Sequence, residues 1–299
     1  MKKIQEYIIN FINGFCMALA DSVPGVSGGT IAFILGFYDK FVASLDDLFR
    51  GNLAKKKEAL KYLIKIGIGW VVGLLLAISF LADLFNKHIY EMSSLFIGFI
   101  IIAIPIVIKE EKECLKKYQS SLFFVFGALL VFLITYLNRS TGINFDFNTF
   151  NITSFIYVFF AAALAISAMI LPGISGSTIL LIFGVYIPII TKIKEFLHFD
   201  FSTLPILITF GLGVIFGIVT FTKFLRVSLD KRRSSTVYAI LGMMVASIYA
   251  IVMGPTTLEE PVNYLTIDTF NIWYFFLGGV IILSLEGLKK LLSKEDINE

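Results

Sequence analysis

The feature that most constrains this chain is an internal repeat of about 148 residues. Residues 24–38, PGVSGGTIAFILGFY, align without a gap on residues 172–186, PGISGSTILLIFGVY, and nine of the fifteen positions are identical. The agreement continues further along the chain, because a G-x-G-x-x-x-G pattern starts at Gly67 and again at Gly211. Chance does not keep such an order over a whole half, so we predict two copies of one structural unit.

The composition places both copies in a membrane. Apolar residues make up 57% of the 299 residues, charged residues make up 16%, and the mean hydropathy is +0.86. A soluble chain usually carries about 25% charged residues. Here the charges collect between apolar stretches of about 18–25 residues, the length that crosses a hydrocarbon core as a helix. We therefore predict an all-α integral membrane protein. Its clean candidate spans are residues 61–85, 92–108, 121–138, 204–225, 236–253 and 272–288.

Each half begins with an apolar segment that Pro and Gly interrupt, at residues 4–49 and 154–196, and continues with three clean spans. Each interrupted segment either crosses once or enters and returns as a hairpin. Lys and Arg decide between these arrangements, because cytoplasmic loops are rich in both. Hairpins place most of the 25 basic residues on one side, whereas single crossings divide the basic loops almost evenly. We therefore predict a re-entrant-type helical hairpin in each half.

Three spans per half is an odd number, so the second copy must have the inverted topology. Residues 1–150 are the predicted first repeat, with a hairpin that enters from the cytoplasmic side. Residues 151–299 are the predicted second repeat, with a hairpin that enters from outside. Both termini are expected to be cytoplasmic. The sequence does not decide whether a hairpin stops at mid-membrane or crosses fully and returns.

The two hairpin turns carry the residues that we expect to bind a ligand. Proline removes a backbone donor and glycine permits non-helical dihedral angles, so the helix breaks there. Irregular backbone at membrane depth persists only inside protein or beside a water-filled cavity. Free N–H groups where the helix restarts, together with hydroxyls, favour an anion. The alternative is that both turns are packing kinks. The predicted binding residues are Pro24, Gly25, Ser27, Gly28, Gly29, Thr30, Pro172, Gly173, Ser175, Gly176, Ser177 and Thr178.

Three charged residues lie within or beside the apolar segments. Asp21 precedes the first turn and its repeat counterpart is Met169, so it breaks the symmetry of the two turns. An ionisable group inside a membrane segment is a candidate for coupling a proton or cation, although Asp21 could instead cap a helix or pair with a lysine. Lys65 either snorkels to the surface or serves as a counter-charge for an anion, and Arg139 either anchors its span or serves the same purpose.

Other chemistry finds little support in the sequence. The net charge is only +3, which gives no reason to expect a nucleic acid. Cys16 and Cys114 are too far apart for a metal site or a disulfide framework. The only histidines, His88 and His198, fall in predicted outward loops. We therefore predict no catalytic residue, no metal ligand and no cofactor.

The block at residues 20–30, ADSVPGVSGGT, together with residues 171–177, LPGISGS, resembles the bacterial polyprenyl-phosphate transporter family, PopT. The resemblance covers essentially the whole chain. It implies a transporter rather than an enzyme, which returns undecaprenyl phosphate from the outer to the inner leaflet of the bacterial cell membrane for reuse in peptidoglycan and other cell-wall polymers. It also implies that the turn residues, with Ser27, Thr30, Ser175 and Thr178 foremost, hold the phosphate while Asp21 titrates.

Two alternatives remain open from the residues alone. A membrane-embedded polyprenyl-diphosphate phosphatase would need a nucleophile or general acid beside the turns, and no His, Glu or Arg stands next to either motif. An ion-coupled small-anion transporter or channel would use the same turns for another anion. The sequence leaves the coupling ion, the tail-length preference and a homo-oligomer undecided.

Overall fold

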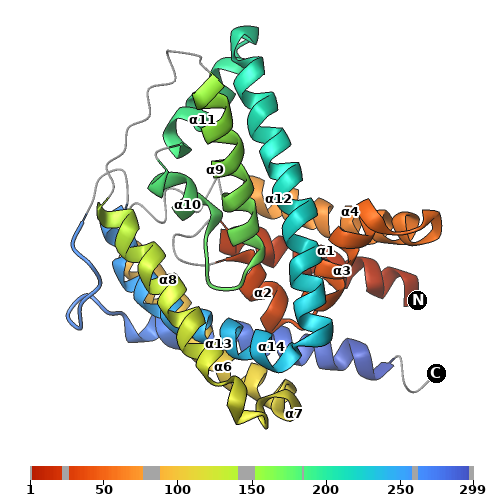
Figure 1. The fold of residues 1–299 in the computed structure, drawn as a ribbon. Helices are drawn as coiled ribbons and strands as arrows, with labels where there is room; N and C mark the ends of the chain where they lie inside the picture. Colours follow the sequence, from red (N-terminus) through yellow and green to blue (C-terminus); the bar gives the residue numbers. More distant parts are fainter. Residues whose placement is uncertain are drawn as a thin grey trace.

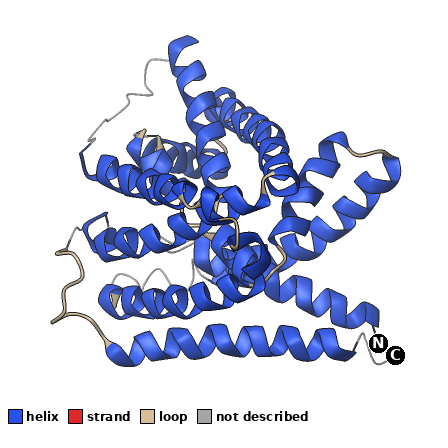
Figure 2. Ribbon diagram, turned by 60° about the horizontal axis from the view of Figure 1, so that its bottom comes forward, coloured by secondary structure: helices blue, strands red, loops and turns tan. Residues whose placement is uncertain are grey.

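The computed structural model describes residues 2–21, 27–76, 88–140, 152–183, 185–257 and 262–295. All regular secondary structure within these ranges is helical (Figure 2). Five of the described helical segments are long and apolar enough to cross a membrane, which confirms the predicted all-α membrane class. These segments are Leu53–Leu76, Ile89–Glu110, Ile152–Ile170, Phe201–Lys231 and Arg233–Thr256.

The helices follow the same order in both halves (Figure 1). The first half contains α1 (Lys2–Asp21), α2 (Gly28–Ile34), α3 (Tyr38–Arg50), α4 (Leu53–Leu76), α6 (Ile89–Glu110), the short α7 (Lys112–Leu115) and α8 (Leu122–Ser140). The second half contains α9 (Ile152–Ile170), α10 (Gly176–Ile182), α11 (Tyr186–Leu197), α12 (Leu204–Lys231), α13 (Arg233–Met253) and α14 (Ile272–Glu295).

The interrupted segments break where the sequence predicts. Each becomes a long helix, a seven-residue helix and an amphipathic helix, which are α1, α2 and α3 in the first half and α9, α10 and α11 in the second. The six clean spans correspond to α4, α6, α8, α12, α13 and α14. The predicted end of the first span, at residues 77–85, lies outside the described residues.

Two glycines show the direction in which α1 and α4 run. A Cβ atom on Gly69 would overlap the carbonyl oxygen of Phe11, and one on Gly73 would lie 2.7 Å from the carbonyl oxygen of Phe15. The contact advances by one turn on both helices together, so α1 and α4 run parallel with their backbones in close contact. A short loop cannot join the end of one helix to the start of a parallel neighbour. The chain therefore returns between α1 and α4 through α2 and α3.

The second half repeats this packing at equivalent positions. A Cβ atom on Gly213 would overlap the carbonyl oxygen of Phe159, and one on Gly217 would lie 2.5 Å from the carbonyl oxygen of Ala163. Phe159 and Ala163 lie 148 positions beyond the two first-half residues that accept the same contacts. Helices α9 and α12 therefore run parallel, and the G-x-G-x-x-x-G pattern serves close backbone packing in both copies.

The remaining spans pair between the two halves. Helix α6 packs along α14, and α8 lies beside α13 (Figure 1). Both pairs are parallel, because their contacts also advance together. The contacts are Gly98 with Phe275 and Gly279 with Ile102 in the first pair, and Gly242 with Phe124 and Tyr249 with Phe132 in the second. The two halves are therefore interleaved into one helical bundle.

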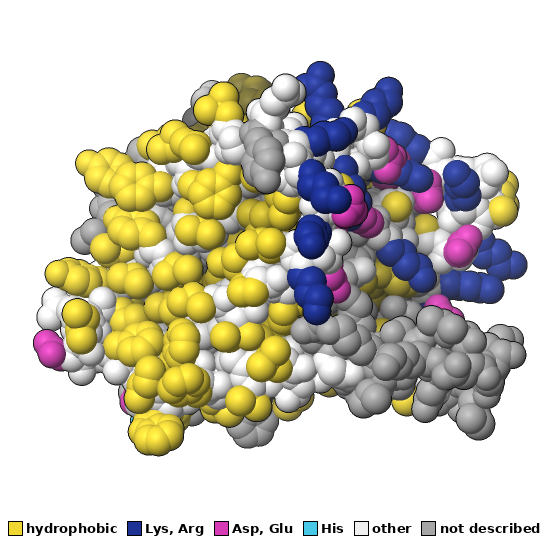
Figure 3. Space-filling view, turned by 90° about the horizontal axis from the view of Figure 1, so that it is seen from below, with side chains coloured by type: hydrophobic (Ala, Val, Ile, Leu, Met, Phe, Trp, Pro, Cys, Tyr) yellow, Lys and Arg dark blue, Asp and Glu magenta, His cyan; other side chains and the backbone are white. Residues whose placement is uncertain are grey.

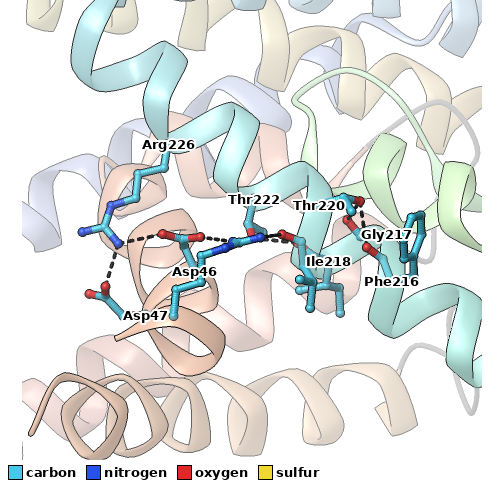
Figure 4. A network of polar contacts seen from close by, with 10 residues as sticks. Asp46, Asp47, Phe216, Gly217, Ile218, Thr220, Thr222 and Arg226 are labelled. Atoms are coloured by element: carbon cyan, nitrogen blue, oxygen red, sulfur yellow. Dashed lines mark hydrogen bonds and ion pairs between the residues drawn. The ribbon is translucent and has the colours of Figure 1, made fainter. Parts of the chain in front are cut away.

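Ion pairs join α3 of the first half to α12 of the second (Figure 4). The Arg226 guanidinium lies 3.0 Å from the Asp46 carboxylate and 2.6 Å from the Asp47 carboxylate. Asp46 also pairs with Arg50, which donates a hydrogen bond to the carbonyl of Val219 within α12. The end of α12 therefore lies against α3, immediately before the start of α4.

A second ion-pair cluster joins three elements at Arg233, the first residue of α13. Its guanidinium lies 2.6 Å from Asp39 at the start of α3 and also pairs with Glu111, which ends α6. Figure 3 shows Lys and Arg side chains gathered with acidic ones on one part of the surface, while hydrophobic side chains cover another part. The starts of α4 and α13 and the ends of α6 and α12 thus lie at one charged end of the bundle.

The close packing of α1 and α4 predicts unequal effects of the same substitution at two neighbouring glycines. Ala is favoured over Gly in a helix by about 1 kcal/mol. At Gly67, where a Cβ would meet nothing within 4 Å, Gly67→Ala should leave the thermal unfolding temperature in detergent unchanged or raised. Gly69→Ala should lower it by several degrees, because overpacking costs about 1–3 kcal/mol. Equal unfolding temperatures for the two variants would contradict the parallel contact.

The contact between α3 and α12 predicts coupling between Arg226 and Asp47. Arg226→Gln and Asp47→Asn should each lower the free energy of unfolding by about 1 kcal/mol, since the pair is partly exposed. The double variant should lose less than the sum of the two, as measured in a double-mutant cycle. Lys223→Gln, one turn earlier on α12 and exposed, is the control and should be additive with Asp47→Asn.

Candidate functional site

The described part of the first turn, residues 27–30, is called here the first tip. Ser27 has an extended backbone and precedes α2, and its hydroxyl accepts a hydrogen bond from the Gly29 N–H at 3.1 Å. The same hydroxyl points at carbonyl oxygens of the other half, 3.0 Å from Leu171 and 3.2 Å from Met169. Ser27 is fully buried. It thus caps its own helix and holds the opposite turn.

The second turn, residues 171–178, is called the second tip, and it contacts the first tip directly. The Gly173 N–H donates a hydrogen bond to the Thr30 hydroxyl at 2.7 Å. A Cβ atom on Gly29 would lie only 2.5 Å from the carbonyl oxygen of Ile170, so this approach requires glycine. The Tyr38 hydroxyl donates to the same carbonyl at 3.1 Å. The structure therefore brings the two predicted turns together.

Within the second tip, Gly173 has a φ of +86°, a conformation that glycine adopts without strain. The hydroxyls of Ser175 and Ser177 lie 2.7 Å apart and hydrogen-bond to each other. Pro172, Gly173, Ser175 and Gly176 are buried, whereas Ser177 and Thr178 are half-buried. The hydroxyl cluster of this tip is thus open on one side.

Equivalent residues of the two tips have different partners. The hydroxyl of Ser27 contacts the opposite half, whereas that of its counterpart Ser175 stays within its own tip. Thr30 accepts a hydrogen bond across the junction, and its counterpart Thr178 lies half-buried. The repeated motif is thus shared by both tips, whereas the described contacts of its equivalent hydroxyls differ.

Asp21, the last residue of α1, connects the first tip to α4. One carboxylate oxygen accepts a hydrogen bond from the Gly28 N–H at 2.7 Å, and the other accepts one from the Trp70 indole N–H at 3.2 Å. A Cβ atom on Gly28 would lie 2.6 Å from the carboxylate, so a side chain there would push Asp21 out of this position. Of the alternatives that the sequence leaves open for Asp21, the structure shows the capping contact.

The other predicted residues lie as follows. The ammonium of Lys65 is 2.9 Å from the Glu6 carboxylate and 4.2 Å from the centre of the Tyr7 ring, so its described contacts are with α1 rather than with a tip. Pro24 and Gly25 lie outside the described residues. Arg139 lies in α8, and its side chain is also outside the described part.

Sequence reasoning missed two residues at this site. Tyr38 ends the repeated motif, and its identity with Tyr186 was a usable signal. Trp70 carried none, because its repeat counterpart is Val214 and a single tryptophan in a span usually reports an interface or packing position. The carbonyl groups that receive the Ser27 hydroxyl could not be predicted, because backbone conformation at the break is not encoded by residue type.

A pocket of about 260 Å³ is lined by Tyr38, Phe33, Asp39, Glu111 and Arg233 among others. It extends from the charged end, where Arg233 pairs with Asp39 and Glu111, to Tyr38, whose hydroxyl contacts the Ile170 carbonyl just before the second tip. No group of three or more His, Cys, Asp or Glu that could hold a metal ion occurs among the described residues. The junction, where the two tips meet, offers hydroxyls, amides and the Asp21 carboxylate, a set suited to binding and releasing a polar group.

Comparisons with known proteins show the family to which the chain belongs. Residues 17–268 match the family model described as VCA0040-like, undecaprenyl phosphate translocase-like. The chain is 34% identical over 259 residues to the polyprenyl-phosphate transporter of Staphylococcus aureus (strain NCTC 8325 / PS 47), covering 83% of this chain and 87% of the relative. It is 32% identical over 272 residues to the polyprenyl-phosphate transporter of Vibrio cholerae serotype O1 (strain ATCC 39315 / El Tor Inaba N16961), covering 87% and 82%.

No solved structure matches the chain. The family model covers both tips and most of the two halves, and both relatives align over more than four-fifths of their own length. The family that the two motifs predict is thereby confirmed. The chain belongs to the undecaprenyl phosphate translocase-like family.

Proposed function

We propose that this chain transports undecaprenyl phosphate from the outer to the inner leaflet of the bacterial cell membrane. The returned lipid carrier is then available for reuse in cell-wall polymer synthesis. Membership of the family and the names of both relatives support a polyprenyl-phosphate substrate. The isoprenoid tail can stay in the hydrocarbon throughout, so the protein has to move only the headgroup.

The observation that carries this proposal is the meeting of the two tips inside the bundle. A phosphate that leaves water needs new hydrogen-bond partners, because burying an unpaired charge costs many kcal/mol. The hydroxyls of Ser27, Thr30 and Ser175 and the amide of Gly173 lie at one junction, and they can exchange their present partners for phosphate oxygens. The flanking glycines allow the headgroup to approach the backbone.

We further propose that residues 1–150 and 151–299 are inverted repeats with re-entrant hairpins. The parallel pairs α1–α4 and α9–α12 support a return of the chain between their members. The charged end supports the inversion, because α4 begins there whereas its counterpart α12 ends there. The basic loops at this end favour a cytoplasmic location, and the start of α1 and the end of α14 lie toward one side in Figures 1 and 2.

Asp21 is the proposed coupling group, since it is the acidic side chain in contact with a tip. It binds a proton during one half of the cycle and releases it in the other.

The contacts of Lys65 with Glu6 and Tyr7 favour the interpretation that Lys65 snorkels along α1. Arg139 remains a predicted counter-charge or anchor. Alternating movement of the two halves about the junction of the tips would expose that junction to each side of the membrane in turn.

Removing one hydroxyl from each tip should slow transport. A hydrogen bond to a charged group contributes about 1.5–3 kcal/mol, so Ser27→Ala combined with Ser175→Ala should lower the rate at least about tenfold. The measurement is movement of radiolabelled undecaprenyl phosphate between the leaflets of reconstituted vesicles. The matched control combines Ser167→Ala with Ser247→Ala, whose hydroxyls bond only carbonyls of their own helices.

An unchanged rate in the tip variant would mean that the phosphate binds elsewhere. The same vesicles separate the other candidate functions. Release of inorganic phosphate from undecaprenyl diphosphate would identify a phosphatase. An electrical current carried by small anions without movement of the lipid would identify a channel. Either result would replace the proposed function.

A further inference from the structure

The Asp21 carboxylate is held by exactly two described hydrogen bonds from two different structural elements. Gly28 belongs to α2 of the first tip, and Trp70 belongs to α4, the span that packs parallel to α1. Each bond uses a different carboxylate oxygen. Asp21 thus forms a bridge from the first tip to a transmembrane span.

The chemistry of the two donors constrains the state of this bridge. A backbone N–H and an indole N–H can only donate, so each requires an acceptor oxygen. A carboxylate supplies an acceptor at both oxygens. A protonated carboxyl carries its hydrogen on one oxygen, which then acts as a donor and becomes a much weaker acceptor for an N–H partner. Protonation of Asp21 therefore weakens one of the two hydrogen bonds, whichever oxygen takes the proton.

The repeat supplies an independent observation. At the positions equivalent to Asp21 and Trp70, the second half has Met169 and Val214. The second half therefore has apolar residues in place of both the carboxylate and the indole, although it retains the surrounding glycines and the parallel packing. A tryptophan needed only to fill space between α1 and α4 would not explain why the carboxylate and the indole occur as a pair in one half.

We propose that Trp70 is a positioning residue for proton-coupled transport. It holds the Asp21 carboxylate against the first tip, and proton binding at Asp21 weakens the bridge and loosens the hold of α4 on the first tip. The step adds one proton from water to the carboxylate, and loss of that proton restores both hydrogen bonds. This inference rests on the proposed function of the junction, whose coupling step it specifies.

Other titratable groups lie on the elements that pack around Asp21. Helix α2 has none. The groups on α1 are Lys2, Lys3, Glu6, Tyr7 and Cys16, and those on α4 are Lys55, Lys56, Lys57, Glu58, Lys61, Tyr62 and Lys65. Lys65 is paired with Glu6, and no described hydrogen bond or ion pair joins any of these side chains to Asp21. The pH dependence of the bridge is therefore assigned to Asp21.

The first test compares the pH dependence of transport in the native chain and in Trp70→Phe, which keeps an aromatic ring but removes the N–H. We expect the midpoint of the pH profile to move to higher pH by at least about half a unit, because the charged carboxylate loses one of its two donors. Asp21→Asn should remove the pH dependence. A purely structural role for Trp70 predicts a lower rate at every pH with the midpoint unchanged, and that result would overturn the inference.

The second test leaves Trp70 in place, so it does not depend on the folding of a core variant. Trp70 and Trp273 are the only tryptophans, and Trp273 is 79% exposed, so Trp273→Phe makes Trp70 the sole indole reporter. Its fluorescence emission in detergent should change with pH over the range in which transport changes. Adding Asp21→Asn should abolish that change. A titration that persists in Asp21→Asn, or that follows sodium concentration instead of pH, would contradict the inference.

The two tests also separate this inference from the proposed function. If the native chain moves lipid phosphate but Trp70→Phe keeps the native midpoint, the positioning role fails and the transport proposal stands. If the native chain moves no lipid phosphate at any pH while the emission of Trp70 still titrates through Asp21, the proposed function fails and the bridge stands.

Discussion

Backbone groups at a helix break inside a bilayer must find hydrogen-bond partners within the protein, because lipid tails offer none. This chain has a helix break in each half, and the described residues of the two breaks share hydrogen bonds. The Gly173 N–H donates to the Thr30 hydroxyl, and the carbonyl of Leu171 receives the Ser27 hydroxyl. Each broken segment thus supplies hydrogen-bond partners to the other where the two meet.

Small residues make that meeting geometrically possible. Gly29 allows the first tip to reach the carbonyl of Ile170, while Gly69 and Gly213 let the neighbouring spans run parallel at backbone contact. Close parallel packing keeps each long helix of a broken segment fixed to its own span. Between them, α2 is buried along its whole length, and the ion pairs of Arg226 and Arg233 hold α3 at the charged end of the bundle.

Sequence reasoning reached the helical class, the positions of the breaks and the helices that carry the six apolar stretches, because hydropathy, Pro and Gly determine these directly. Four of those six helices are among the five described candidate membrane spans, while the described apolar parts of α8 and α14 are shorter and α9 is the fifth span. Sequence reasoning also reached Ser27, Thr30 and Asp21, since a repeated motif and a charge in an apolar segment are visible without coordinates. It could not reach the exchange of partners between the tips, which depends on backbone direction at the break. The contact of Trp70 with Asp21 was also out of reach, because 49 residues separate them and the repeat offers no second example.

The mutual pairing of the two tips also reduces their need for water. The Ser27 hydroxyl is bonded to a carbonyl and the Gly173 amide is bonded to a hydroxyl, so neither group requires a water molecule at this contact. Polar groups that are satisfied within the protein give a chain of water molecules fewer partners between the two tips.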